Sequence, residues 1–422
     1  MVAAVMAVPL IGMVPLSSVH GVQPIVAQYL GMIALLAMSL DQLIATRAGL
    51  VEKIFGGLDR SYILHKWLGI GAVVAMFLHD QIDAEIDSFG RGDTWNQLGE
   101  ELGEIGYYGI LVLIAITVAT FIPYHLWRWS HKLMGAFFAL CATHFFLVQK
   151  PFSNFSFLGL YVGIFCLAGL LAYLYTLLPA RRFSAKQYKV AASSSNGDAL
   201  EIRLEPEAAP LRHRAGQFAF VSFEQDGLKE THPFTISKGP TEDGSLRFTT
   251  KPLGDFTTAL KSGLQLGTSV SVTGPHGRFT AESSERPQIW IAAGIGITPF
   301  AAWVQTLQND GPTVHLFFTV RKLGQASHLD ELKAAAQRLP NFNLHLFETA
   351  TGPRLDAAQI ASALGDDLKR SDVYYCGPKP LREILKSELS KLGVAARRFH
   401  FEEFEIRTGI GIGRLIKRFK KR

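Results

Sequence analysis

The spacing of apolar residues divides the chain into two halves with different periods. In the first half, six apolar stretches come near the roughly 20 residues that a helix needs to cross a bilayer core of about 30 Å. They cover 1–17, 23–45, 61–80, 106–124, 130–149 and 156–178. After Pro179 the pattern changes to short alternating stretches between turn residues, which predicts strands. We therefore expect a membrane bundle of six helices followed by soluble domains.

The soluble half predicts two domains of different topology. A flexible loop is expected at Ser193–Gly197, and a small antiparallel barrel follows from four candidate strands: Gln217–Phe223, Phe234–Ser237, Leu246–Thr250 and Val270–Val272. From Gln288 strands alternate with helices, which indicates a parallel sheet. The expected domains are a transmembrane domain at 1–180, the barrel at 181–284 and an α/β domain at 285–422.

Charge and cysteine content narrow the class of protein. Residues 1–180 hold 8 Lys/Arg and 11 Asp/Glu, whereas residues 181–422 hold 34 and 25. The excess cations stand beside the membrane half, so anionic lipid is a simpler partner than nucleic acid. None of the three cysteines, Cys141, Cys166 and Cys376, belongs to a C-x-x-C pair. Iron–sulfur clusters, thiolate zinc sites, c-type haem and a disulfide framework therefore lack their ligands.

Loop charges predict the orientation of the helices. Basic residues fall in the loops after the second, fourth and sixth stretches: Arg47, Lys53, Arg60, Arg128, Arg181, Arg182 and Lys186. The loop from Asp80 to Glu104 is acidic. Cytoplasmic loops carry the excess of Lys and Arg, so both termini are expected in the cytoplasm and the third and fifth helices run parallel. The first stretch fits a signal peptide or an uncleaved helix, and the lack of any Lys or Arg before Arg47 favours the helix.

Four histidines stand in the third and fifth stretches, where ionisable residues are functional candidates by default. They are His65 and His79 in one, and His131 and His144 in the other. The 14-residue separation of the first two turns about 1,400° and rises about 21 Å, so both share a face at different depths. A parallel partner helix then gives two facing pairs, each able to hold one b-type haem between two imidazoles.

The fifth stretch does not fit an ideal helix. A spacing of 13 residues leaves His131 and His144 about 140° apart. We therefore expect a kink or tightened turn near Gly135, or compensating helix tilt and side-chain reach. The alternative is that these histidines only bond neighbouring helices, as a lone histidine often does.

Three glycine- and hydroxyl-bearing segments of the barrel suit a flavin. One combines a cation-capable group, an aromatic ring and hydroxyls, the features that bind a pyrophosphate and an isoalloxazine: His232, Pro233, Phe234, Thr235 and Ser237. A second resembles a phosphate-binding loop: Lys251, Gly254, Asp255 and Thr257. The third is a turn at Gly274. Strand and turn chemistry explains each of them alone equally well.

The α/β domain carries features of a dinucleotide site. After the strand Gln288–Ala293 come Gly294, Gly296, Thr298 and Pro299 at the start of a helix, although the third glycine of the common fingerprint is missing. Arg321 follows the next strand, where it suits a 2′-phosphate and hence NADPH; a plain surface basic pair with Lys322 is the alternative. Another strand, Asp372–Cys376, ends at Cys376, Gly377 and Pro378. We expect Cys376 beside the nicotinamide and not as a nucleophile.

This order of motifs resembles the NADPH oxidase and ferric reductase family over nearly the full length, and compact prokaryotic NADPH oxidases most. The resemblance implies FAD at His232–Ser237 with Thr235 near N5, pyrophosphate contacts at Gly254–Thr257, and NADPH contacts at Gly294–Pro299, Arg321 and Cys376–Pro378. It implies an aromatic residue against the flavin, for which Phe404 is the candidate and Phe401 the alternative. It also implies a bacterial-type inner (plasma) membrane, a cytoplasmic dehydrogenase half and no obligate regulatory subunit.

The expected function is electron transfer from NADPH through FAD and two b-type haems to oxygen, giving superoxide. A ferric-chelate reductase that uses the same path is one alternative. A non-enzymatic transporter with a nucleotide-sensing domain is another, in which the histidines relay protons. The C-terminal extension is basic and interleaved with apolar residues, and fits either the anionic inner leaflet or a solvated tail.

Overall fold

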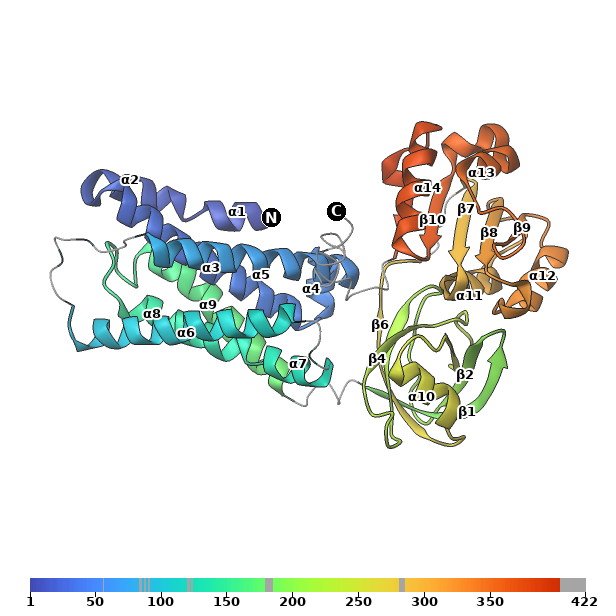
Figure 1. The fold of residues 1–422 in the computed structure, drawn as a ribbon, viewed down its shortest axis with the longest axis horizontal. Helices are drawn as coiled ribbons and strands as arrows, with labels where there is room; N and C mark the ends of the chain where they lie inside the picture. Colours follow the sequence, from blue (N-terminus) through green and yellow to red (C-terminus); the bar gives the residue numbers. More distant parts are fainter. Residues whose placement is uncertain are drawn as a thin grey trace, which may run out of the picture. The chain divides into compact units, whose positions relative to one another are not determined.

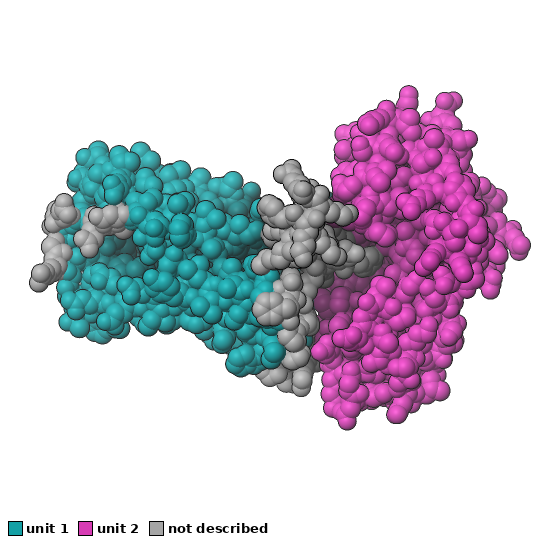
Figure 2. Space-filling view, in the orientation of Figure 1, with its two compact units in different colours: residues 1–179, 405–422 teal, residues 180–404 magenta. Residues whose placement is uncertain are grey.

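The computed structural model describes residues 1–55, 57–82, 92–119, 124–178, 185–280 and 285–402, together with 86, 89 and 122. The chain folds as two compact units (Figure 2). Residues 1–179 form most of the first unit, and residues 180–404 form the second. Each unit is described by itself.

The first unit is helical, as the long apolar stretches predict (Figure 1). Its helices are α1 Val2–Ala7, α2 Leu10–His20, α3 Val22–Ala45, α4 Gly49–Phe55, α5 Leu58–Gln81, α6 Thr94–Val118, α7 Tyr124–His131, α8 Met134–Leu147 and α9 Phe157–Leu177. Within the described residues, five segments are long and apolar enough to cross a membrane: Val2–His20, Val22–Ala45, Arg60–Gln81, Thr94–Val118 and Phe157–Leu177. The prediction of a helical membrane bundle is confirmed.

Two of the six predicted spans differ in the structure. The predicted span at 130–149 is divided between α7 and α8, and α8 has only 14 residues. The predicted span at 106–124 begins earlier, because Asp93 caps α6 by accepting a hydrogen bond from the backbone N–H of Asn96 at 2.8 Å. The acidic residues Glu100, Glu101 and Glu104 therefore lie on a helix and not in a loop. Because these residues are charged, a prediction based on apolar stretches does not include them in the helix.

Glycines bring α6 close to α8. A β-carbon on Gly99 would lie 2.9 Å from Leu147 Cβ, and one on Gly106 would lie 2.6 Å from Cys141 Sγ. Small residues at such contacts let membrane helices approach closely. α3 packs along both α5 and α9. Apolar side chains such as Val112 and Leu171 stay exposed on the outside of the unit, as expected of a surface in contact with lipid.

The second unit begins with a six-stranded antiparallel barrel sheet in the order β4-β3-β6-β1-β2-β5. Its strands are β1 Lys186–Asn196, β2 Ala199–Pro206, β3 Phe218–Phe223, β4 His232–Thr235, β5 Leu246–Thr250 and β6 Ser269–His276, with helix α10 at Asp255–Gly263. Alternating residues such as Val221 and Phe223 fill its core.

The predicted flexible loop at Ser193–Gly197 is wrong. Ser193 to Asn196 continue β1 and pair with Ile202 to Ala199 of β2, so the turn is confined to Gly197 and Asp198. The ladder satisfies the backbone groups of the three serines, which overrides their low preference for strands.

A five-stranded parallel sheet follows, in the order β11-β10-β7-β8-β9. The elements are β7 Gln288–Ala293, α11 Thr298–Thr306, β8 Val314–Val320, α12 Leu329–Arg338, β9 Phe342–Glu348, α13 Ala357–Leu364, β10 Asp372–Cys376, α14 Lys379–Lys391 and β11 Phe399–Phe401. β7 and β10 are buried along almost their whole length. The predicted α/β topology is confirmed.

Candidate functional site

His65 on α5 and His131 at the end of α7 form the first histidine pair. Their ring centroids lie 6.2 Å apart and the rings are inclined by 76°. Nδ1 of His65 lies 3.2 Å from Oδ1 of Asp41 on α3. The ring of His131 stacks on Trp127 at 5.1 Å. The structure therefore brings together two histidines that are 66 residues apart in the sequence.

His79 on α5 and His144 on α8 form the second histidine pair. Their ring centroids lie 6.3 Å apart, with the rings inclined by 71°. Nδ1 of His79 is 2.8 Å from the carbonyl oxygen of Ala27, and Nδ1 of His144 is 2.9 Å from that of Gly99. A carbonyl only accepts hydrogen bonds, so each Nδ1 carries the proton and each Nε2 keeps a free lone pair. Such backbone contacts orient histidines that ligate a metal.

A tightened turn between α7 and α8 brings the two histidines of this segment onto one side. The backbone N–H groups of Lys132, Leu133 and Ala136 bond the carbonyls three residues earlier, at 3.2, 2.9 and 3.0 Å. Bonds of this spacing are typical of a 3₁₀ turn, which winds more tightly than an α-helix. The irregularity predicted near Gly135 is confirmed. Along the chain direction, the two histidines of α5 pair in the same order with those of α7 and α8.

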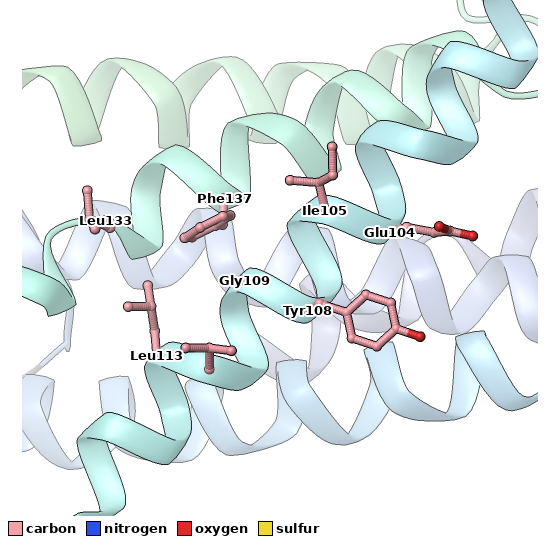
Figure 3. A pocket seen from close by; sticks show the side chains of 8 residues that line it. Glu104, Ile105, Tyr108, Gly109, Leu113, Leu133 and Phe137 are labelled. Atoms are coloured by element: carbon pink, nitrogen blue, oxygen red, sulfur yellow. The ribbon is translucent and has the colours of Figure 1, made fainter.

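A surface groove of about 600 Å³ lies between α6 and α8, and none of the four paired histidines is among the residues that line it (Figure 3). Phe137 and Leu133 line one side, and Ile105, Gly109 and Leu113 line the other. Apart from Glu104 and Tyr108 the lining is apolar, as a lipid-facing surface would be.

The flavin motif of the barrel forms a row of stacked rings. His232 lies 3.9 Å from Phe256 of α10, nearly parallel to it, and Phe234 lies 6.4 Å from the same ring. Pro233 is exposed and Thr235 is buried. Ser237 is buried and contacts Thr249 Oγ1 at 2.9 Å inside the barrel. His232 and Phe234 are thus half-buried, with Phe234 packed against the barrel core, and Ser237 is buried.

The predicted phosphate loop forms the N-terminus of α10. Thr257 Oγ1 accepts hydrogen bonds from the backbone N–H groups of Leu253 and Gly254, at 3.0 and 3.2 Å. Gly254 is exposed, a β-carbon there would have open space around it, and Asp255 is the first residue of the helix. Helix N-termini attract phosphates. Lys251, in contrast, pairs with Asp198 at 2.5 Å.

The two loops at the carboxyl ends of β7 and β10 touch. Gly294 has a φ of +56° and opens a 3₁₀ turn at Gly294–Ile297, followed by Thr298 and Pro299 in the first turn of α11. A β-carbon on Gly296 would lie 2.2 Å from the carbonyl oxygen of Cys376. Nucleotides bind where such strand ends meet in open α/β sheets. Gly296 is therefore required by the contact between the loops, besides any ligand.

Cys376, Gly377 and Pro378 end β10 at this meeting point. Cys376 is fully buried, and burial raises the pKa of its thiol well above the ordinary value. A neutral thiol is a poor nucleophile, as expected for this residue. Gly377 lies against Ala293 of β7, because a β-carbon added at residue 377 would stand 2.7 Å from Cβ of that alanine. Arg321 follows β8 and is exposed.

Three other predicted positions are reported separately. Gly274 has a φ of +152° and stands near the end of β6, where His276 lies 5.3 Å from the ring of Phe220. Phe404 and the basic C-terminal extension lie outside the described residues. Phe401 is described, on β11, with its ring 4.1 Å from the Arg382 guanidinium.

A buried polar network joins the barrel to the parallel sheet, and its residues belong to none of the sequence motifs described above. Nε2 of His328 lies 2.9 Å from Thr249 Oγ1, and its Nδ1 lies 3.2 Å from Glu331. Arg247 of β5 pairs with the same Glu331 at 3.1 Å. The backbone N–H of His328 donates to Asn196 at 2.7 Å. We call these five residues the junction network. His328 has a φ of +61°, which is uncommon for a residue other than glycine.

Three families match the chain in series. The family described as "Ferric reductase like transmembrane component" matches residues 30–142, "FAD-binding domain" matches 183–286, and "Oxidoreductase NAD-binding domain" matches 290–387. The chain has the architecture of the NADPH oxidase and ferric reductase superfamily. The first match contains His65, His79 and His131, and ends two residues before His144. The protein is therefore a membrane oxidoreductase with FAD- and NAD-binding domains.

Curated relatives match parts of the chain. The carnitine monooxygenase reductase subunit of Escherichia coli is 33% identical over 148 residues, which are 35% of this chain and 44% of that protein. The toluate 1,2-dioxygenase electron transfer component of Pseudomonas putida is 28% identical over 214 residues, 48% of this chain and 63% of that protein. The chain thus spans less than two thirds of either relative.

A solved structure has a similar fold over most of the chain. The flavohemoglobin from Malassezia yamatoensis aligns with a TM-score of 0.51 and 20% identity, covering 92% of this chain and 97% of that one. At this level of identity the likeness concerns the fold alone.

Proposed function

We propose that the protein transfers electrons from cytoplasmic NADPH, through FAD and two b-type haems, to molecular oxygen on the outer face of a membrane. The product would be superoxide: one NADPH and two O₂ give NADP⁺, one proton and two superoxide ions. The observation that carries this proposal is the pair of matched histidine contacts, at 6.2 and 6.3 Å between ring centroids.

The two pairs fit haem iron by their spacing and donor set. Two metal–nitrogen bonds of about 2 Å, plus the half-widths of two rings, require roughly 6 Å between centroids. In the second pair both Nδ1 atoms contact carbonyls, which leaves both Nε2 atoms for a metal. Within the described ranges no group of three or more His, Cys, Asp or Glu side chains converges on one point. Two histidines per site suit a porphyrin, whose ring supplies the remaining ligands.

When bound, NADPH supplies a hydride, FAD divides its two electrons, and haem carries them singly. The chain holds these groups in sequence. His232, Phe234 and the α10 N-terminus would hold the flavin, and the loops at Gly296 and Cys376 would hold the nicotinamide half of NADPH. His65 and His79 stand on one helix about 21 Å apart along its axis, enough to cover most of a bilayer core of about 30 Å.

Charge at the helix ends supports this direction of transfer. Arg47, Arg60 and Arg128 lie toward the ends that carry the first histidine pair, and Asp80, Asp93 and Glu100 lie toward those that carry the second. The positive-inside rule puts the first pair on the cytoplasmic side. His79 and His144 would hold the second haem from two sides, and a haem so held would supply single electrons to an acceptor that does not bind its iron. This favours one-electron reduction of oxygen.

The test uses the purified full-length chain in lipid nanodiscs, supplied with FAD. We expect a reduced-minus-oxidised spectrum of two b-type haems and NADPH-dependent cytochrome c reduction that superoxide dismutase abolishes. His79→Ala should remove one haem and the superoxide. A chain without haem would overturn the electron path proposed here.

A ferric-chelate reductase is the second candidate, because the matched transmembrane family is described as ferric reductase like. The discriminating measurement is NADPH consumption with oxygen alone and with ferric chelate alone under argon. Faster turnover with the chelate, together with no dismutase-sensitive product, would replace oxygen as the acceptor and keep the rest of the path.

A further inference from the structure

The two histidine pairs differ in the groups that lie next to their Nδ1 atoms. In the second pair, His79 and His144 both contact neutral backbone carbonyls, at 2.8 and 2.9 Å. In the first pair, Nδ1 of His65 faces the carboxylate of Asp41 at 3.2 Å, and Nδ1 of His131 has no hydrogen-bond partner among the described residues. Each pair therefore consists of two histidines, but only the first has a carboxylate next to one of the Nδ1 atoms.

Asp41 is an unusual residue for its place. It is the single acidic residue of α3, and its side chain is only 12% exposed. Its Oδ1 and Nδ1 of His65 are both buried and have no hydrogen-bond partner among the described residues, so the 3.2 Å ion-pair contact between them is what joins the two side chains. Gly69, one turn after His65 on α5, lies beside the carboxylate: a β-carbon there would be 3.4 Å from Oδ2, an ordinary van der Waals contact. An ionisable group at such a position is costly and is a functional candidate by default.

We propose that Asp41 is a positioning residue that holds the Nδ1 proton of His65 and makes the first haem the harder of the two to reduce. This rests on the proposed function, in which His65 ligates haem. A carboxylate partner fixes the tautomer and raises the basicity of a ligating histidine, and a more basic ligand stabilises ferric over ferrous iron. Hydrogen bonds to a charged acceptor are about twice as strong as those to a neutral one.

The consequence is a built-in direction for electron flow. The first haem, near the dehydrogenase side in the proposed orientation, has the lower reduction potential. The second haem, held by carbonyl-bonded histidines, has the higher one. Transfer from the first to the second is then downhill, and return is uphill.

The experiment is a redox titration of both haems in the full-length chain, followed in the visible spectrum. Asp41→Asn keeps an oxygen acceptor and removes the charge. We expect this variant to retain both haems. The equilibrium constant for reduction of the first haem should rise about tenfold, which is a rise of about 59 mV in its one-electron reduction potential. Ser39→Ala is the matched control, because Ser39 is also buried on α3 but bonds the carbonyl of Leu35. It should leave both potentials unchanged.

A second measurement needs no change at Asp41. His79→Ala leaves only the first haem and His65→Ala leaves only the second, so each can be titrated alone. The first should reduce at the lower potential. The proposal is overturned if the order is reversed, or if Asp41→Asn keeps both haems at their original potentials. Absence of haem from the unmodified chain would instead contradict the proposed function, so the two failures are distinguishable.

Discussion

Gly103 of α6 lies directly against the imidazole of His144 on α8. A β-carbon at residue 103 would stand 2.5 Å from Nδ1 of that histidine, which is closer than side-chain atoms pack. The same Nδ1 bonds the carbonyl of Gly99, one turn earlier on α6. The orientation of His144 thus depends on a glycine and a carbonyl of one neighbouring helix.

Gly103→Ala should therefore remove one of the two proposed haems. The added methyl group displaces the ring and breaks its bond to Gly99, so the second pair no longer converges. Haem content per chain and the reduced-haem spectrum measure the loss. Gly71→Ala is the control, because Gly71 lies on α5 with no atom within 4 Å of a β-carbon. Full haem content in Gly103→Ala would show that the second pair does not bind haem in this geometry.

The junction network should couple Thr249 to His328. Their side chains are 2.9 Å apart in a buried setting, so Thr249→Val and His328→Asn each remove the same contact. A double-mutant cycle should give a coupling free energy of about 0.5–3 kcal/mol. The measurement is chemical unfolding of the flavin-loaded chain, followed by release of flavin fluorescence.

The control cycle pairs His328→Asn with Thr268→Val, because Thr268 bonds Gln225 and the carbonyl of Gln265 instead. These two changes should be additive. Additivity in the Thr249–His328 cycle as well would mean that their contact contributes nothing to the free energy of unfolding.

Much of the fold could be predicted because its signals are local. Apolar stretches of about 20 residues mark helices in a membrane, and alternation followed by strand–helix repeats marks the two soluble folds. The errors arose where tertiary contacts override the pattern. The α6 helix extends through Glu100 and Glu104 because Asp93 caps it, and β1 continues through Ser193 because β2 pairs with it.

The site was predictable to a different degree in each half. Four histidines at matched spacing predict two pairs, and the mismatch at 13 residues predicts an irregularity, of which the tightened turn is one form. Asp41 and the junction network could not be found this way. Asp41 lies on α3 and contacts His65 on α5, and His328 contacts Thr249, which is 79 residues away in the sequence. Contacts of this kind depend on which elements become neighbours, and no short motif records that.

Arg321 should set the preference for NADPH over NADH. It is exposed just after β8, at the sheet edge where the loops of Gly296 and Cys376 meet. Loss of a charged contact to a 2′-phosphate should raise the KM for NADPH about 10- to 100-fold in Arg321→Ala. The KM for NADH, which lacks that phosphate, should not change. Steady-state kinetics with both nucleotides measure this.

Arg338→Ala is the matched control for Arg321, because Arg338 is equally exposed but lies at the end of α12. It should affect neither nucleotide. An equal loss of NADPH and NADH affinity in Arg321→Ala would assign Arg321 to the shared part of the nucleotide.

Glu331 should make the second unit sensitive to acid. Burial alone would raise the pKa of Glu331, but its contacts with His328 and Arg247 outweigh burial and hold the pKa below the ordinary value of 4.5. A group with a lowered folded pKa stabilises the fold above its unfolded pKa, and this stability is lost as the pH falls through the folded pKa. The denaturant concentration at the midpoint of unfolding should therefore fall as the pH is lowered below about 4.5. In Glu331→Gln this component of the drop should be missing, whereas Glu207→Gln, at an exposed position, should follow the unmodified chain. Identical pH profiles for all three proteins would mean that the carboxylate of Glu331 does not stabilise the junction network.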